Sequence, residues 1–164
     1  MTLKEIAGRL KQLKSAVIFC HMRPDGDTLG AGMGLCRMLH SVGVRCSVVC
    51  ESAIPQKFTF LEGMDGIGKM PAASAEAYIA VDCSEPPRLG TLGDTFERAK
   101  KIKFNIDHHI SNTRYADYNF VEERAATCEI MTELSQYFEG QPDALTANYL
   151  MLGLSSDTGN FAHK

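Results

Sequence analysis

Short apolar runs that alternate with longer segments of helical periodicity constrain the fold more than any other feature of this chain. Four such runs are typical of strands and lie at residues 16–20, 44–50, 77–82 and 101–107. The first run, AVIFC, is apolar at every position, as expected for a strand that is buried on both faces of a sheet. We therefore predict an α/β domain with a mostly parallel sheet and helices on both of its faces.

The helical segments lie before, between and after these runs. Apolar residues recur every three or four positions over 3–13, which is typical of an amphipathic helix. A second helix is expected over 27–43, with Asp27 near its N-cap. Two further helices are expected over 122–138 and 143–157.

The composition is that of one soluble globular domain. Of the 164 residues, 45% are apolar and 23% charged, and the formal net charge is −3. Such a chain has no general attraction for nucleic acid or an anionic membrane, and it lacks the run of ~20 apolar residues that spans a bilayer. We expect a cytoplasmic protein without membrane contact. The cysteines, which form no C-x-x-C pair, are expected to be buried free thiols: Cys20, Cys36, Cys46, Cys50, Cys83 and Cys128.

Acidic residues and histidines are concentrated where the predicted strands and the last helix end. In parallel sheets, ligands bind beyond the carboxyl ends of the strands, so the residues that follow the strands are expected to share one edge. The acidic residues and histidines follow the first, third and fourth predicted strands, and one more aspartate precedes Gly159 in SSDTGNF. The residues are His21, Asp25, Asp27, Asp82, Asp107, His108, His109 and Asp157.

So many titratable groups in one cleft would repel one another and shift their pKa values unless a cation neutralised them. Carboxylate and imidazole ligands without thiolates favour Mn²⁺ before Mg²⁺, with Zn²⁺ or Co²⁺ as alternatives. The ligands exceed what one ion needs. Two ions about 3.5–4 Å apart, bridged by one carboxylate, form an arrangement that hydrolyses phosphate esters.

Each group taken alone has an ordinary structural explanation. The aspartates of DGD at 25–27 could form a turn with a helix cap, and Asp82 could be a loop carboxylate. The metal interpretation is favoured because one site explains all the groups together. Gly30, Gly32 and Gly34 fit no phosphate-loop spacing. They indicate either close packing on a strand or backbone contact near the metals, and the sequence leaves both open.

Four stretches resemble, in order, the motifs of the DHH phosphoesterase superfamily. They are HMRPDGDTLGAG at 21–32, VDCSEPPRLG at 81–90, IDHHISN at 106–112 and SSDTGNF at 155–161. The third and fourth look most like the branch of bacterial oligoribonucleases and 3'-phosphoadenosine 5'-phosphate phosphatases. The resemblance implies a catalytic α/β domain that hydrolyses phosphate esters.

The resemblance also implies a ligand set for two divalent ions, Mn²⁺ first, with Mg²⁺ or Co²⁺ as alternatives. The first ion would be held by His21, Asp25 and Asp82. The second would be held by Asp27, Asp82, His108 and Asp157. Asp82 would therefore bridge the two ions.

Four further residues receive roles from the resemblance. His109 would contact the scissile phosphate and stabilise its developing charge, and Asp107 would orient a neighbouring histidine or strand end. Arg88 and Asn112 match family positions, where they could bind substrate or be structural. Ala31 departs from the serine that many members carry, which removes a hydroxyl but no ligand.

Members of the superfamily normally continue into a second domain, with a Gly-Gly-Gly-His-like motif, that grips the substrate. No such motif occurs here, and we expect residues 1–164 to be the catalytic domain alone. The expected partners are short single-stranded oligonucleotides or small phosphorylated nucleotides, and a homodimer is compatible with the sequence. Two alternatives stay open: a module that binds a nucleotide without turnover, and an inorganic pyrophosphatase of the same superfamily.

Overall fold

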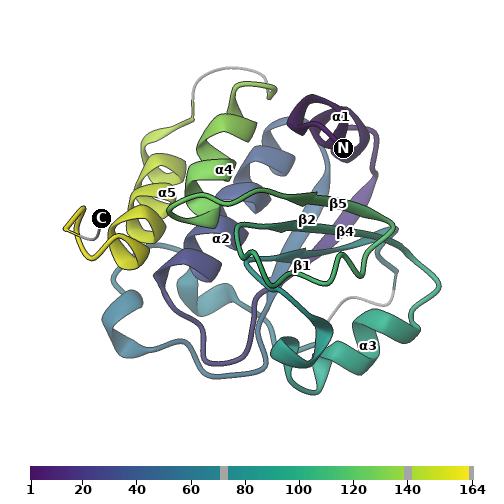
Figure 1. Ribbon diagram of the computed structural model, residues 1–164, viewed down its shortest axis with the longest axis horizontal. Helices are drawn as coiled ribbons and strands as arrows, with labels where there is room; N and C mark the ends of the chain where they lie inside the picture. Colours follow the sequence, from purple (N-terminus) through teal and green to yellow (C-terminus); the bar gives the residue numbers. More distant parts are fainter. Residues whose placement is uncertain (71–73, 139–141, 163–164) are drawn as a thin grey trace.

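The computed structural model describes residues 1–70, 74–138 and 142–162, and it contains one parallel sheet in the order β2-β1-β3-β4-β5 (Figure 1). Every pairing between neighbouring strands is parallel, as the alternation of strands and helices predicted. The strands are β1 (Ser15–Phe19), β2 (Arg45–Val49), β3 (Ala77–Val81), β4 (Ile102–Asp107) and β5 (Tyr118–Val121).

Helices cover both faces of this sheet. In Figure 1, α1, α2, α4 and α5 lie on one side and α3 lies on the other. The strand residues alternate accordingly: Ile18 packs with the first group of helices, whereas Val17 and Phe19 pack with Phe96 of α3. The helices are α1 (Leu3–Leu10), α2 (Gly26–Ser41), α3 (Leu92–Arg98), α4 (Thr127–Ser135) and α5 (Ala144–Asp157), and short 3-10 turns occupy Gln56–Phe58, Met64–Gly66 and Pro86–Leu89.

The predicted boundaries differ from the structure in several places. Strand β5 and helix α3 were not predicted, because β5 is a four-residue edge strand with only one buried residue and α3 has only seven residues. Helix α4 begins at Thr127 and not at residue 122, since Ala126 before it is extended. The N-cap of α2 is Asp25 and not Asp27: the Asp25 carboxylate accepts the backbone N–H groups of Asp27 and Thr28.

Close packing explains the glycines of α2. A Cβ on Gly30 would lie 2.3 Å from the carbonyl oxygen of Tyr149, and one on Gly34 would lie 2.9 Å from the side chain of Leu150. Both neighbours belong to α5. A Cβ on Gly32 would instead lie 2.8 Å from Sγ of Cys20, just after β1. The glycines therefore let α2 approach β1 and α5, and this approach brings the two helices together beside the strand ends.

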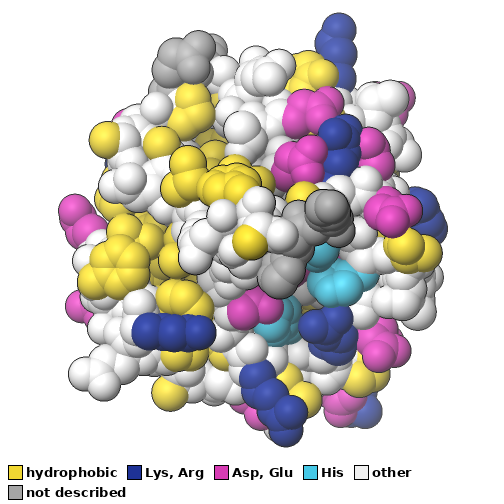
Figure 2. Space-filling view, turned by 60° about the vertical axis from the view of Figure 1, so that its left-hand side comes forward, with side chains coloured by type: hydrophobic (Ala, Val, Ile, Leu, Met, Phe, Trp, Pro, Cys, Tyr) yellow, Lys and Arg dark blue, Asp and Glu magenta, His cyan; other side chains and the backbone are white. Residues whose placement is uncertain are grey.

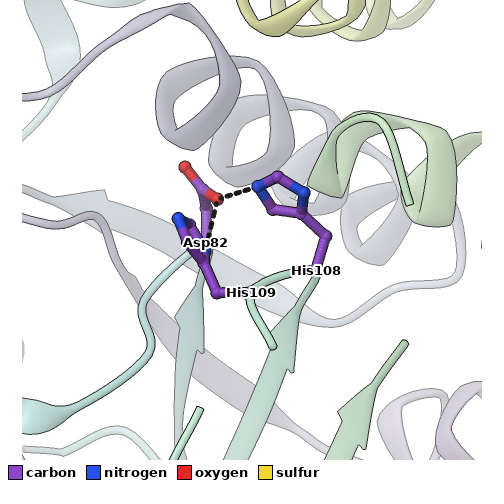
Figure 3. Close-up of side chains that lie close together, drawn as sticks. All are labelled: Asp82, His108 and His109. Carbon is purple, nitrogen blue, oxygen red and sulfur yellow. Dashed lines mark ion pairs between the residues drawn. The ribbon is translucent and has the colours of Figure 1, made fainter. Parts of the chain in front are cut away.

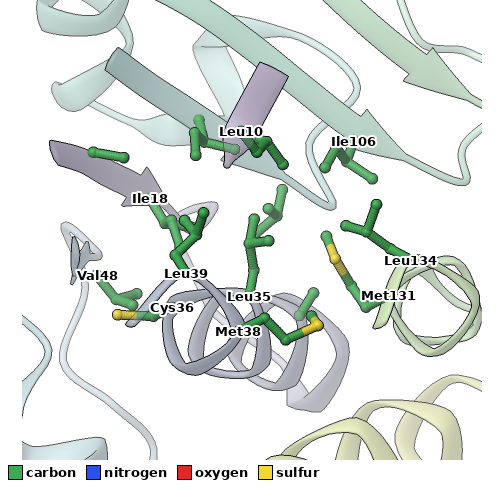
Figure 4. Packing of buried hydrophobic residues seen from close by; sticks show 14 of the residues in the cluster. Leu10, Ile18, Leu35, Cys36, Met38, Leu39, Val48, Ile106, Met131 and Leu134 are labelled. Atoms are coloured by element: carbon green, nitrogen blue, oxygen red, sulfur yellow. The ribbon is translucent and has the colours of Figure 1, made fainter. Parts of the chain in front are cut away.

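The apolar core between the sheet and helices α1, α2, α4 and α5 is continuous. In Figure 4, Leu39 of α2 lies near Ile18, and Leu134 of α4 lies near Ile106 of β4. The six cysteines are free thiols, and five of them are buried; Cys46, on the edge strand β2, is partly exposed. Across the described ranges, the helices are too short or too polar for a membrane span.

Candidate metal centre

The acidic residues and histidines singled out in the sequence meet at the carboxyl ends of β1, β3 and β4. His21 follows β1, Asp82 follows β3 directly, and Asp107 is the last residue of β4. The first turn of α2 adds Asp27 from one side and the last residue of α5, Asp157, closes the cluster from another. Parallel strands end at one edge, so the topology itself gathers groups that lie up to 136 residues apart along the chain.

Asp82 occupies the centre of this cluster. Its Oδ2 lies 3.4 Å from Nε2 of His21. Its Oδ1 lies 3.5 Å from Nε2 of His108 and 3.7 Å from Nδ1 of His109 (Figure 3). The residue is 2% exposed and has a φ of 52°, in the left-handed region that non-glycine residues rarely adopt. Such strain is typical of a residue whose orientation has a function.

Three groups of side chains could each hold a metal ion, because their ligand atoms lie within 4.8 Å of one another. The first contains His21, Asp25 and Asp82. The others are Asp27 with His108 and Asp157, and Asp82 with His108 and His109. Asp82 and His108 each belong to two groups, so the candidate positions adjoin one another.

The buried histidine nitrogens test whether a cation fits here. Nδ1 of His21 lies 2.9 Å from the carbonyl oxygen of Met22, and Nδ1 of His108 lies 2.9 Å from that of Arg124. A carbonyl can only accept, so Nδ1 donates and the lone pair of a neutral ring stays on Nε2. Both Nε2 atoms are buried, face carboxylates and have no hydrogen-bond partner among the described residues. A divalent cation bound between them would be coordinated by the Nε2 lone pairs and by the carboxylates. The donor set therefore fits a divalent metal ion.

The pKa values of the cluster show how strongly it needs positive charge. Burial, together with repulsion by Asp82 and Asp157, raises the pKa of Asp27 to about 8. Burial and repulsion by Asp82 raise the pKa of Asp157 to about 6. Burial disfavours a charged His21, yet the carboxylates of Asp25 and Asp82 raise its pKa to about 10. Without a metal, the cluster takes up protons in place of a cation.

The outer edge of the cluster is built around His109. Its Nδ1 lies 2.7 Å from Oδ1 of Asp107, and this hydrogen bond raises the pKa of the imidazole. Burial opposes ionisation of Asp107, but hydrogen bonds from His109 and Asn112 lower its pKa. Figure 2 shows histidine side chains reaching the surface beside acidic and basic side chains. His109 is therefore held by a carboxylate behind it and is half exposed in front.

Arg88 and Asn112 lie on opposite sides of this pair. Nη1 of Arg88 is 3.4 Å from Nε2 of His109, at the outer edge. The amide of Asn112 donates to Oδ2 of Asp107 at 2.6 Å and lies 2.7 Å from Oδ1 of Asn105. Nη1 of Arg88 also donates to Oγ of Ser84 at 3.4 Å. Arg88 therefore lies beside Nε2 of the half-exposed His109, whereas the amide of Asn112 is used inside the protein.

The sequence analysis missed one residue of the site, Thr127. Its hydroxyl donates to Oδ1 of Asp82 at 3.0 Å, and its backbone N–H donates to Oδ2 of Asp27 at 2.6 Å. The prediction of a helix from residue 122 put Thr127 in a helix interior, where it carried no signal. Recognising the extended stretch before it would have marked it as a first-turn residue.

The fold and this site define a parallel α/β domain with a carboxylate–histidine cluster able to hold metal ions at its strand ends. The chain belongs to the DHH family: the model of the DHH family N-terminal domain matches residues 15–155. The matched residues contain the first three of the sequence motifs, and the fourth begins where the match ends.

Curated relatives and a solved structure resemble this chain over almost its whole length. The chain is 30% identical to the bifunctional oligoribonuclease and PAP phosphatase NrnA of Thermus thermophilus, covering 97% of this chain and 48% of that protein. It is 27% identical to the probable enzyme of the same name from Streptococcus mutans, covering 98% and 51%. A crystal structure of an exopolyphosphatase-related protein from Bacteroides fragilis superposes with a TM-score of 0.91 at 21% identity, covering 98% and 51%. The chain thus spans about half the length of the curated relatives it matches.

Proposed function

We propose that this chain is the catalytic domain of a metal-dependent phosphoesterase that hydrolyses short oligonucleotides, 3'-phosphoadenosine 5'-phosphate, or both. One observation carries this function: Asp82 directs one carboxylate oxygen at His21 and the other at His108. A carboxylate between two groups of ligands is what a pair of neighbouring ions requires. Membership of the DHH family and the names of the relatives support the reaction and the substrate class.

Two divalent ions, with Mn²⁺ as the expected metal, would occupy the cluster. His21, Asp25 and Asp82 would hold the first ion. Asp27, His108 and Asp157 would hold the second, together with Oδ1 of Asp82. When bound, such ions supply Lewis acidity and lower the pKa of water.

His109 is the residue of this chain placed to act on the substrate. Because Asp107 accepts from Nδ1, the lone pair of the neutral ring is on Nε2, where it accepts from Nη1 of Arg88. When the ring is charged, Nε2 would instead donate to a phosphate oxygen. Arg88 adds a second positive charge 3.4 Å from that nitrogen. Together they would stabilise the charge that develops on phosphate oxygens during hydrolysis.

The substrates named for the relatives carry phosphate on a ribose. The chain as a whole is acidic, so attraction for such ligands must come from the ions, Arg88 and His109. The half-exposed position of His109 suits a small ligand that approaches from the surface. We place the enzyme in the cytoplasm, where its free thiols would stay reduced, and the chemistry described here does not require a homodimer.

The test begins with protein stripped of metal by a chelator and then given Mn²⁺. Release of mononucleotide from a dinucleotide is followed beside release of phosphate from 3'-phosphoadenosine 5'-phosphate, with inorganic pyrophosphate as a third substrate. Metal-dependent turnover of either nucleotide is the expected result. Turnover of pyrophosphate alone would contradict the proposed nucleotide substrates and would indicate an inorganic pyrophosphatase.

Metal binding is measured on the same protein by calorimetric titration. Two ions bound without turnover would support the site but not catalysis by these residues alone. If the protein shows no turnover and also binds no Mn²⁺, the proposed function is refuted.

A further inference from the structure

The N-terminus of α4 is attached to two of the candidate ligands at once. The carboxylate of Asp27 accepts the backbone N–H of Thr127 at Oδ2, 2.6 Å away, and that of Cys128 at Oδ1, 2.8 Å away. The hydroxyl of Thr127 donates to Oδ1 of Asp82 at 3.0 Å. Asp27, Thr127 and Cys128 are all fully buried, so water does not compete for these hydrogen bonds.

This arrangement serves both the helix and the carboxylate. The first N–H groups of a helix lack partners within it, and Ala126 at the N-cap has no side chain that could accept them. Asp27, 100 residues earlier in the chain, takes the place of the cap. In return, both oxygens of Asp27 are fixed in direction, with one of them 4.0 Å from Nε2 of His108.

The packing around this junction leaves little room for another arrangement. A Cβ on Gly153 of α5 would lie 2.2 Å from Sγ of Cys128 and 2.7 Å from Oδ1 of Asp27. Only glycine therefore lets α5 close over the contact between α2 and α4. Three helices meet at the Asp27 carboxylate and hold it against the sheet.

We propose that Thr127 is a positioning residue for the metal centre, acting through its hydroxyl on Asp82 and through its backbone on Asp27. This inference rests on the proposed two-metal function. The Thr127 hydroxyl occupies one lone pair of Oδ1 and restricts how the central carboxylate can rotate. Asp82 is then held so that each of its oxygens faces a different candidate ion, before any ion is bound.

Three variants of the full chain test this role by Mn²⁺ titration calorimetry on metal-free protein. Thr127→Val removes the hydroxyl and keeps the shape, and Thr127→Ser restores the hydroxyl. Thr132→Val is the matched control, because Thr132 lies on the same helix but donates to the carbonyl of Cys128, away from the ligands. We expect Thr127→Val to weaken binding of at least one ion about 10–100-fold. Thr127→Ser and Thr132→Val should bind as the wild type does.

Melting of the metal-free protein separates positioning from folding. A merely structural role would lower the melting temperature of metal-free Thr127→Val and leave Mn²⁺ affinity unchanged, and that result would overturn the inference. Thr127→Ala replaces the valine variant if the latter does not fold, and wild-type affinity in it would overturn the inference equally. Wild-type protein that binds no Mn²⁺ would instead refute the proposed function, so the two failures are distinguishable.

Discussion

The inner and outer halves of the cluster differ in how firmly the protein holds them. In the inner half, the side chains of Asp27 and Asp82 are 0% and 2% exposed and are tied to α4. The outer half consists of His109 and Arg88, and the side chain of His109 is 29% exposed. The inner half is built for ligands whose geometry must not change. The outer half leaves room for a substrate to approach.

Two fully buried aspartates show why burial alone does not decide the charge of a site. Asp107 has His109 and Asn112 as donors, and its pKa is lowered in spite of burial. Asp27 has only neutral donors and two nearby carboxylates, and its pKa is raised to about 8. The protein itself therefore supplies the groups that stabilise a charged Asp107. The positive charge that would stabilise a charged Asp27 must come from a bound cation.

The largest effect is expected for Asp82→Ala, because Asp82 belongs to two of the candidate ligand groups and faces both His21 and His108. Both ions should be lost, and metal-dependent turnover should fall to background. Titration with Mn²⁺ and the dinucleotide assay measure the two effects. Full activity in this variant would contradict the two-metal site.

His109→Ala tests whether the outer half acts on substrate and not on metal. Turnover should fall about 10²–10³-fold, as when one donor to a developing charge is removed, while two Mn²⁺ ions still bind. His40→Ala is the matched control, because His40 is exposed on the last turn of α2 and contacts the backbone of Cys46. Loss of metal binding in His109→Ala would show that His109 is needed for metal binding, and it would contradict the assignment of the outer half to the substrate.

Asn112→Ala tests the support behind the outer half. The change leaves the buried Asp107 without one of its donors, and we expect a loss of about 1–3 kcal/mol in the free energy of unfolding. A role in positioning predicts a kcat about tenfold lower with KM unchanged. A raised KM with normal kcat would instead assign Asn112 to substrate binding.

The pH dependence of stability reports on the inner half. In the metal-free protein, Asp27 with a pKa of about 8 and Asp157 with a pKa of about 6 keep protons that the unfolded chain has released. His21, with a pKa raised to about 10, does the same above its ordinary value of about 6.5. The folded state therefore binds more protons, and stability falls as pH rises between about 4 and 10.

Melting temperatures at about pH 5.5 and pH 8.5, with chelator or with saturating Mn²⁺, measure this slope. A decrease of several degrees is expected in chelator, since about 1 kcal/mol shifts the melting temperature of a chain of this size by roughly 2–4 °C. Mn²⁺ should remove the decrease by displacing the protons. A metal-free protein that is more stable at the higher pH would contradict the charge assignment.

The smallest effect is expected for Cys46→Ser. Cys46 lies on β2 at the edge of the sheet, is partly exposed and is not a ligand candidate. Turnover and metal binding should stay at wild-type values, with only a small change in melting temperature. A folded variant that loses turnover would refute the assignment of the thiols to packing.

The sequence predicted much of the fold because its strongest signals are local. Continuous apolar runs mark β1 and β3, which are buried on both faces. Weak local signals failed: β5 has one buried residue, and the start of α4 depends on a cap that comes from Asp27, far away in the chain. The glycines of α2 showed that something approaches closely, but only the structure showed that α5 does so for two of them.

The sequence by itself determined the α/β class, the DHH motifs and the residues that gather at the strand ends, because residue type and its place after a strand are local properties. Only the tertiary structure decided how these residues face one another. It placed Asp82 between His21 and His108, committed the amide of Asn112 inside the protein and brought Thr127 to the site. Those relations depend on side-chain directions across segments distant in the chain, and such directions are set by packing.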